Sequence, residues 1–108
     1  MHELSITQSV VDTVVERVEC KVTGVRLEIG RISGILPDAV RFCFDLVCAG
    51  TPLEGAWLEI VEPEAKARCR VCAEEFAPAS AVVLCPCGSA DVDVLAGREL
   101  RITAVEVA

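Results

Sequence analysis

Four of the seven cysteines in this chain of 108 residues form two close pairs, and this pattern constrains the fold more than any other feature. The first pair is Cys69 and Cys72, and the second pair, Cys85 and Cys87, follows about a dozen residues later. Two turns that each contribute two thiolates are typical of a zinc ribbon, in which four sulfurs surround one tetrahedral Zn(II). Disulfides are rare inside cells, and paired cysteines beside glycine and proline are poor core material. The pattern therefore predicts a structural zinc site.

The second pair is shorter than a usual zinc knuckle, because only Pro86 separates Cys85 from Cys87. Side chains at positions i and i+2 of an extended segment point to the same side, so both sulfurs can still reach one ion. Pro86 fixes a backbone dihedral and Gly88 permits a sharp exit from the turn. Iron and a redox-active dithiol remain alternatives to zinc at these residues.

The charge of the chain argues against a nucleic-acid partner. The sequence has 10 Lys and Arg against 17 Asp and Glu, which gives a formal charge of −7. A ribbon that binds a phosphate backbone is expected to be basic, and residues 65–98 are not. No apolar run approaches the length of a membrane span, and the first residues lack the pattern of a signal peptide. We therefore expect a cytoplasmic protein that binds neither nucleic acid nor membrane.

Hydrophobic periodicity predicts a helix at the start of the chain. From Ser5 to about Cys20, apolar residues recur at every fourth position and form one continuous stripe. Ser5 and Gln8 have the spacing of a capping box, which would begin the helix and leave His2 and Glu3 just outside it.

The remaining elements complete an α+β pattern. Val25–Ile29 alternates between apolar and charged residues and is expected to be a strand, as are Ala56–Glu62 and the C-terminal segment Gly97–Val107. Pro37 is expected to open a second helix with one apolar face, formed by Val40, Phe44 and Val47. We predict two helices packed on a small three-stranded sheet, an inserted zinc-ribbon lobe, and a C-terminal strand that returns to the sheet.

The expected division is into one domain formed by residues 1–64 plus 98–108 and a zinc-ribbon domain formed by residues 65–97. The ribbon has few apolar residues, and pieces below about 40 residues usually need a metal or a crosslink to fold. The other cysteines, Cys20, Cys43 and Cys48, have no second cysteine at ligand spacing and are expected to be small buried side chains.

The only histidine of the chain is His2. At that position the imidazole, the preceding backbone nitrogen and the terminal amine can bind one ion together, and such a nitrogen array suits Ni(II) or Cu(II). By itself the feature is weak, because a histidine at a chain end is usually only solvated.

Several short segments, taken together, resemble the HypA/HybF family of nickel metallochaperones for hydrogenase maturation. Each segment is weak alone, but their order and spacing are specific, and the resemblance covers nearly the whole chain. The segments are Met1–Ser5, Gly30–Gly34 with Pro37 and Phe42 after it, Thr51–Ala56, Cys87–Ser89 and Gly97–Leu100.

The resemblance implies an α+β nickel-binding lobe joined to a zinc ribbon, and reversible metal coordination in place of catalysis. His2 would bind Ni(II) with the backbone nitrogens of residues 2 and 3, and Glu3 would take part through its main chain. Asp38 lies near the family's acidic helper residue, and the four paired cysteines match its zinc ligands.

The resemblance also implies partners. They would be a maturation GTPase of the HypB type and the large subunit of a [NiFe] hydrogenase, or urease in some organisms. Two other functions remain open. A zinc-ribbon adaptor for protein or RNA would leave the terminal histidine unexplained, and a redox dithiol would need an exposed thiol of lowered pKa.

Overall fold

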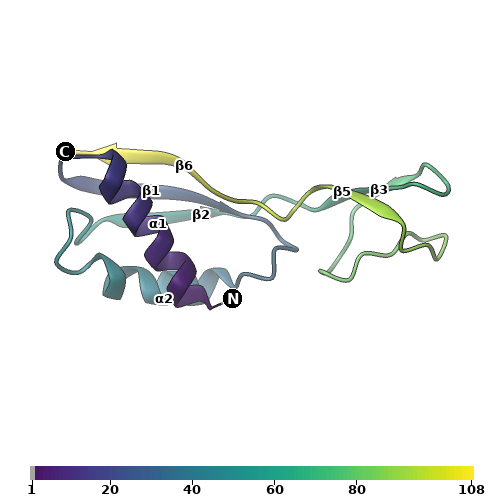
Figure 1. Cartoon of the computed structure of the whole chain (residues 1–108), viewed down its shortest axis with the longest axis horizontal. Helices are drawn as coiled ribbons and strands as arrows, with labels where there is room; N and C mark the ends of the chain where they lie inside the picture. Colours follow the sequence, from purple (N-terminus) through teal and green to yellow (C-terminus); the bar gives the residue numbers. More distant parts are fainter. Residues whose placement is uncertain (1) are drawn as a thin grey trace. The chain divides into compact units, whose positions relative to one another are not determined.

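The first helix, α1, spans Glu3–Arg17 in the computed structural model, which describes residues 2–108 (Figure 1). The apolar stripe is confirmed, because the buried residues of α1 are Ile6, Thr7, Val10, Val11 and Val14. The predicted capping box is wrong. His2 is the N-cap residue, its carbonyl accepts the first helical hydrogen bond from Ile6 N–H at 3.1 Å, and Ser5 lies inside the helix.

The second helix, α2, spans Pro37–Cys48 and begins with Pro37, as predicted. Proline suits the first turn of a helix because its missing N–H would have no helical partner there. Val40 and Phe44 are buried as expected, but the third fully buried residue is Cys48, and Val47 is only half-buried. The helices α1 and α2 pack against each other.

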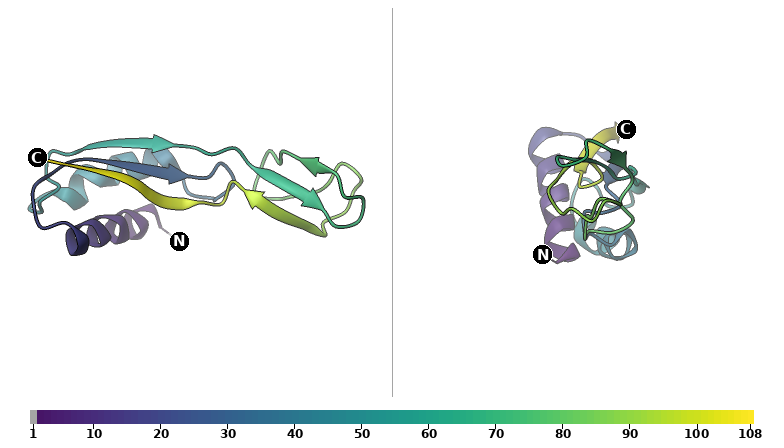
Figure 2. Two further views of the ribbon diagram at one scale, coloured as in Figure 1. Left: turned by 90° about the horizontal axis from the view of Figure 1, so that it is seen from above. Right: turned by 90° about the vertical axis from the view of Figure 1, so that its right-hand side faces the viewer.

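A three-stranded sheet supports the two helices. It consists of β2 (Trp57–Val61), β1 (Val22–Ile29) and β6 (Leu100–Val107) in the order β2-β1-β6, so β1 is central. β1 and β2 run in the same direction and are connected through α2, whereas β6 runs in the opposite direction (Figure 2). Both helices lie on one face of this sheet. The predicted α+β fold and the return of the C-terminal strand are therefore confirmed.

The residues group into two compact units. The first unit comprises the segments up to Leu27, Ile35–Ile60 and Arg101–Ala108, and the second comprises Glu28–Gly34 and Val61–Leu100. The first unit contains the larger core, with buried Val25, Leu27, Phe44 and Leu53 among others. None of the helices formed by residues 2–108 is long and apolar enough to cross a membrane.

The second unit contains a separate small sheet. Its strands are β3 (Lys66–Cys69), β4 (Glu75–Phe76) and β5 (Val92–Ala96), and both neighbours pair antiparallel with the central β3. Few apolar side chains are buried here. They are Ile29 and Ile32 from the segment Glu28–Gly34, and otherwise only the small side chains of Ala65, Ala67, Cys69 and Cys85. Such a core is too small to hold the unit together without a further crosslink or ligand.

One close backbone approach in the second unit requires glycine. Gly97 has a φ of +109° and its carbonyl accepts a hydrogen bond from Ile32 N–H at 2.9 Å. A Cβ atom added to Gly97 would lie 2.6 Å from the Cα atom of Ala65. Any side chain at position 97 would therefore push this residue away from Ala65. A residue other than glycine would also be strained at this positive φ.

The prediction that all three unpaired cysteines are buried is only partly right. Cys48 is buried in the core of the first unit and Cys43 is half-buried, but Cys20 is exposed. Cys20 follows the end of α1, where the helical stripe no longer directs a side chain toward the sheet.

Candidate metal site

The first cysteine pair lies at the turn between β3 and β4. Cys69 is the last residue of β3, and its N–H donates to the carbonyl of Glu74 at 2.9 Å. The turn closes when Ala73 N–H donates to the carbonyl of Cys69 at 3.0 Å. Ala73 has a φ of +65°, which is unusual for a residue with a Cβ atom. The turn directs the side chain of Cys72 back toward Cys69.

The second pair lies in a tight turn of its own. Gly88 N–H donates to the carbonyl of Cys85 at 2.8 Å, and Cys85 N–H donates to the carbonyl of Ser89 at 2.9 Å. Gly88 has a φ of +94°, so the glycine after the pair provides the sharp exit expected from the sequence. The missing residue between Cys85 and Cys87 does not prevent their two sulfurs from facing the same centre.

The two pairs form a single group of four sulfurs. All four Sγ atoms lie within 4.8 Å of one another. The distance from Cys69 Sγ to Cys87 Sγ is 3.8 Å, and that from Cys72 Sγ to Cys85 Sγ is 3.5 Å. Sulfurs about 2.3 Å from a tetrahedral zinc are about 3.8 Å apart, whereas a disulfide bond is about 2.05 Å long. The donor set and its spacing therefore fit Zn(II), which would be held by all four thiolates with no open position for catalysis.

Backbone N–H groups donate hydrogen bonds to Cys69 Sγ and Cys85 Sγ, but to different extents. Cys69 Sγ accepts hydrogen bonds from Val71 N–H at 3.3 Å and from Cys72 N–H at 3.5 Å. The hydrogen bond from Cys72 N–H, helped by the one from Val71 N–H, lowers the pKa of Cys69 to about 6, although burial acts to raise it. Cys85 Sγ accepts a hydrogen bond from Cys87 N–H at 3.4 Å, whereas Gly88 N–H donates to the carbonyl of Cys85 and not to its sulfur.

For Cys85 the balance is opposite. The Cys87 N–H favours its thiolate, but burial and the three neighbouring thiols together raise the pKa of Cys85 to about 12. Backbone hydrogen bonds thus favour the thiolate of Cys69, whereas burial and the neighbouring thiols favour the protonated form of Cys85. A bound cation favours deprotonation of every sulfur it contacts.

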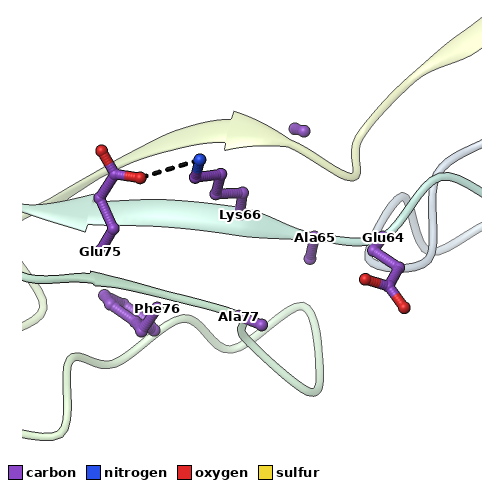
Figure 3. A pocket seen from close by; sticks show the side chains of 7 residues that line it. Glu64, Ala65, Lys66, Glu75, Phe76 and Ala77 are labelled. Carbon is purple, nitrogen blue, oxygen red and sulfur yellow. Dashed lines mark ion pairs between the residues drawn. The ribbon is translucent and has the colours of Figure 1, made fainter.

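Two basic residues of the second unit share one carboxylate group. Lys66 Nζ lies 2.9 Å from Glu75 Oε1, and Arg68 pairs with the other carboxylate oxygen of Glu75. The hydrogen bonds from Arg68 and Lys66 lower the pKa of Glu75 to about 2. A hollow of about 410 Å³ lies beside this pair, lined mainly by alanines and Phe76 (Figure 3). Of the two acidic residues that line it, Glu75 already pairs with Lys66 and Arg68, and no cysteine lines it.

The residues predicted to bind nickel lie in the first unit. His2 is exposed, with extended backbone angles, immediately before α1. Glu3 is the first residue of α1, and its Oε2 accepts a hydrogen bond from Leu36 N–H, just before α2, at 3.4 Å. The terminal amine of Met1, which the predicted chelate includes, lies outside the described residues.

Asp38 lies in the first turn of α2 and is 98% exposed in its side chain, which pairs with Arg41 at 2.7 Å. Among residues 2–108, the four cysteines are the only group of three or more potential metal-binding side chains within reach of one ion. Nickel coordination by His2, Glu3 and Asp38 therefore stays a prediction, and it depends on backbone and terminal nitrogens more than on converging side chains.

Comparison with known proteins gives a consistent result over the whole chain. The model of a family described as hydrogenase/urease nickel incorporation, metallochaperone, hypA matches residues 1–107. The hydrogenase maturation factor HypA of Nostoc sp. is 50% identical over 108 residues, covering 99% of this chain and 96% of that protein. The corresponding factor of Geotalea uraniireducens is 49% identical, covering 99% of both chains.

A solved structure also shares the fold. The solution structure of the Ni metallochaperone HypA from Helicobacter pylori superposes with a TM-score of 0.68, covering 99% of this chain and 97% of that one. The sequences of the two proteins are only 23% identical, so this likeness concerns the fold.

Proposed function

The chain belongs to the HypA family of nickel metallochaperones for hydrogenase maturation, and from this premise we propose that Ni(II) binds at its amino terminus. The proposed ligands are the imidazole of His2, the backbone nitrogens of His2 and Glu3, and the terminal amine. Zn(II) at the four cysteines is structural, and neither metal takes part in bond-breaking chemistry.

The single observation that carries this proposal is the position of His2 immediately before α1. The first helical hydrogen bond joins Ile6 N–H to the carbonyl of His2. A helix leaves its first four N–H groups without intrahelical partners, so the nitrogens of the first residues can bind an ion without breaking a helical bond. Main-chain coordination at this site therefore does not require α1 to unfold.

Electrostatics favours deprotonated backbone nitrogens over neutral ones at this position. The N-terminus of a helix carries a partial positive charge, which disfavours a bare divalent cation. Two deprotonated amides would cancel the charge of Ni(II), so the complex as a whole would be neutral. Calorimetry in buffers of different ionisation enthalpy should therefore detect the release of about two or more protons per nickel bound.

Glu3 would serve the site through its backbone nitrogen, because its carboxylate is directed to Leu36 N–H. Asp38 is proposed as an acidic group near the site, and it must leave Arg41 to contact the metal. Replacing Asp38 by Asn and, separately, Arg41 by Met tests this role. If Asp38 binds nickel, the first change weakens Ni(II) affinity and the second strengthens it.

The decisive experiment changes where the chain begins. Two residues inserted between Met1 and His2 keep the imidazole but move the terminal amine away. Both this extension and His2→Ala should cause a large loss of Ni(II) affinity by calorimetry, while zinc content and thermal stability stay at parental values. An extended protein that binds nickel like its parent would refute the terminal chelate, and unchanged binding in His2→Ala would refute the role of His2.

Nickel bound at an exposed chain end can be taken over by a partner. We infer that the recipients are a GTPase of the HypB type and the large subunit of a [NiFe] hydrogenase. We place the transfer in the cytoplasm, where cysteines that form no disulfides are stable. In a strain that lacks this protein, the parent should restore hydrogenase activity at low nickel and His2→Ala should not. Restoration by His2→Ala would contradict delivery from this site.

A further inference from the structure

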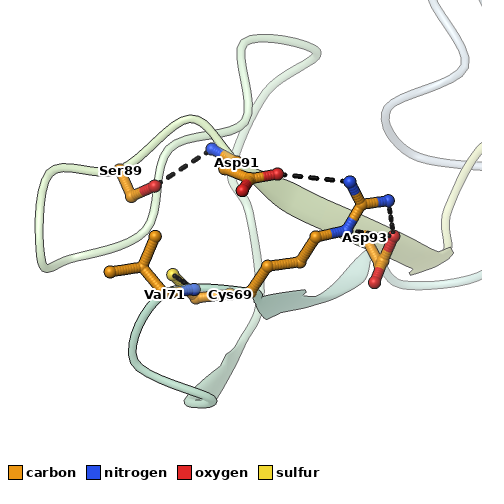
Figure 4. Close-up of polar contacts among 6 residues, drawn as sticks. Cys69, Val71, Ser89, Asp91 and Asp93 are labelled. Carbon is orange, nitrogen blue, oxygen red and sulfur yellow. Dashed lines mark hydrogen bonds and ion pairs between the residues drawn. The ribbon is translucent and has the colours of Figure 1, made fainter.

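Arg70 lies inside the first cysteine turn, between the two ligands Cys69 and Cys72, but its side chain reaches Asp93 in β5 and Asp91 just before that strand. Figure 4 shows these two carboxylates. Arg70 Nε donates to Asp93 Oδ1 at 3.0 Å, its Nη2 contacts the same oxygen, and its Nη1 donates to Asp91 Oδ1 at 3.2 Å. The main chain repeats the connection, because Arg70 N–H donates to the carbonyl of Asp91 at 3.0 Å.

These contacts link the two cysteine turns without any metal. Asp91 N–H donates to Ser89 Oγ at 3.0 Å, and the carbonyl of Ser89 accepts the hydrogen bond from Cys85 N–H at 2.9 Å. A path of hydrogen bonds therefore runs from Arg70 in the first turn, through Asp91 and Ser89, to Cys85 in the second. Arg70 lies 15 positions before Cys85 and 21 before Asp91 in the chain, so its place in this path depends on the folded unit.

Arg70 can act on the metal site by fixing the position of the backbone more than by its positive charge. A site with four thiolates around Zn(II) has a net charge of −2, which a nearby cation would stabilise. The guanidinium of Arg70 is already shared between two carboxylates, and it lowers the pKa of Asp93. Little positive charge remains for the sulfurs, whereas a planar group that holds two carboxylates fixes the position of the backbone that carries it.

We propose that Arg70, held by Asp91 and Asp93, is a positioning residue for the metal site, which keeps the first cysteine pair in place to bind zinc together with the second. Without Arg70, the turn must become ordered when zinc binds, and the lost conformational entropy lowers the zinc affinity. Residues that orient metal ligands typically change affinity 10–100-fold when removed. The proposal rests on the four-cysteine site and not on nickel binding at the amino terminus.

Arg68 offers a matched control in the strand β3, which leads into the cysteine turn. It lies two positions before Arg70, is similarly exposed, and pairs with Glu75 across the sheet, but it is not between two ligands. The variants are Arg70→Met, Arg70→Lys, Asp93→Asn and Arg68→Met, each in the full chain. Zinc affinity is measured by competition with a chromophoric chelator, and the absorption bands of bound Co(II) report the geometry of the four sulfurs.

We expect Arg70→Met to weaken zinc binding about tenfold and to broaden the Co(II) bands. Asp93→Asn should weaken binding in the same direction, although it leaves the cysteine turn unchanged, and Arg70→Lys should fall between parent and Arg70→Met. Arg68→Met should stay within about twofold of the parent. The double variant Arg70→Met, Asp93→Asn should be no worse than Arg70→Met alone, since the two residues act as one unit.

Three results would overturn the proposal. Zinc affinity of Arg70→Met within twofold of the parent would show that the contacts do not act on the metal. An equal loss in Arg68→Met would show a general effect of sheet stability, and additive losses in the double variant would show that Arg70 and Asp93 act separately. A parent that binds no zinc would instead refute the metal site itself, whatever the state of the nickel proposal.

Discussion

Replacing Gly24 by Ala should destabilise the first unit through a single side chain, Trp57. Gly24 lies in the central strand β1, and Trp57 begins the neighbouring strand β2. A Cβ atom at Gly24 would lie 1.8 Å from Cε2 of the indole, and the two next nearest atoms of the same ring are at 2.2 Å and 2.3 Å. No small adjustment relieves such overlap, so the indole must move away from its position over Gly24.

The cost follows from the area that the indole would expose. Because 42% of Trp57 is exposed, roughly 60% of its area, or about 150 Å² of about 250 Å², is covered. At about 25 cal/mol per Å² this cover is worth about 3.5 kcal/mol, which is an upper bound because an unfolded chain is not fully extended. Alanine also restricts the unfolded chain more than glycine does, which stabilises the folded state by about 0.4–1 kcal/mol. When the value of about 3.5 kcal/mol is also reduced by roughly 10–40% for a compact unfolded chain, the net loss is about 2 kcal/mol.

The assay is urea denaturation followed by fluorescence, since Trp57 is the only tryptophan of the chain. The native emission of Gly24→Ala should shift to the red, because the indole becomes more solvated. In a Trp57→Leu background, followed by circular dichroism, the same replacement should cost less than about 0.5 kcal/mol, because the obstacle is gone. A free energy of unfolding within about 0.5 kcal/mol of the parent, with unchanged emission, would refute the reasoning.

Three further predictions concern the cysteines and their surroundings. The double variant Cys69→Ala, Cys72→Ala should contain no zinc by elemental analysis and lose the order of the second unit while the helices persist; one zinc per chain would contradict the assignment. Ala73→Gly should strengthen zinc binding a few-fold in chelator competition, because glycine relieves a left-handed backbone conformation worth about 1 kcal/mol, and weaker binding would show that Ala73 is unstrained. Burial, with the charge of Asp45, raises the pKa of Cys48 to about 11, so little thiolate forms at neutral pH. Alkylation followed by mass spectrometry should therefore label exposed Cys20 and spare Cys48, and equal labelling would show that the core opens readily.

Local patterns in the sequence were enough to predict most elements and the grouping of the four paired cysteines. The stripe of α1, the proline that opens α2 and the alternation in β1 depend on neighbours within a few positions. The cysteine spacing selects a tetrahedral sulfur site because each turn can present only its own two thiolates to an ion. The nickel ligands were predicted from resemblance and from the position of one histidine, and they stay predictions.

Contacts between residues distant in the chain decided the rest. The capping box at Ser5 was a valid local signal, but α1 begins at Glu3, whose carboxylate meets Leu36 N–H 33 residues away. Arg70 looked like an ordinary charged residue between two ligands, and only the fold places Asp91 and Asp93 around its guanidinium. Such pairings depend on which strands become neighbours. The free energy that selects those neighbours comes from burying the whole core, so no short window of sequence contains it.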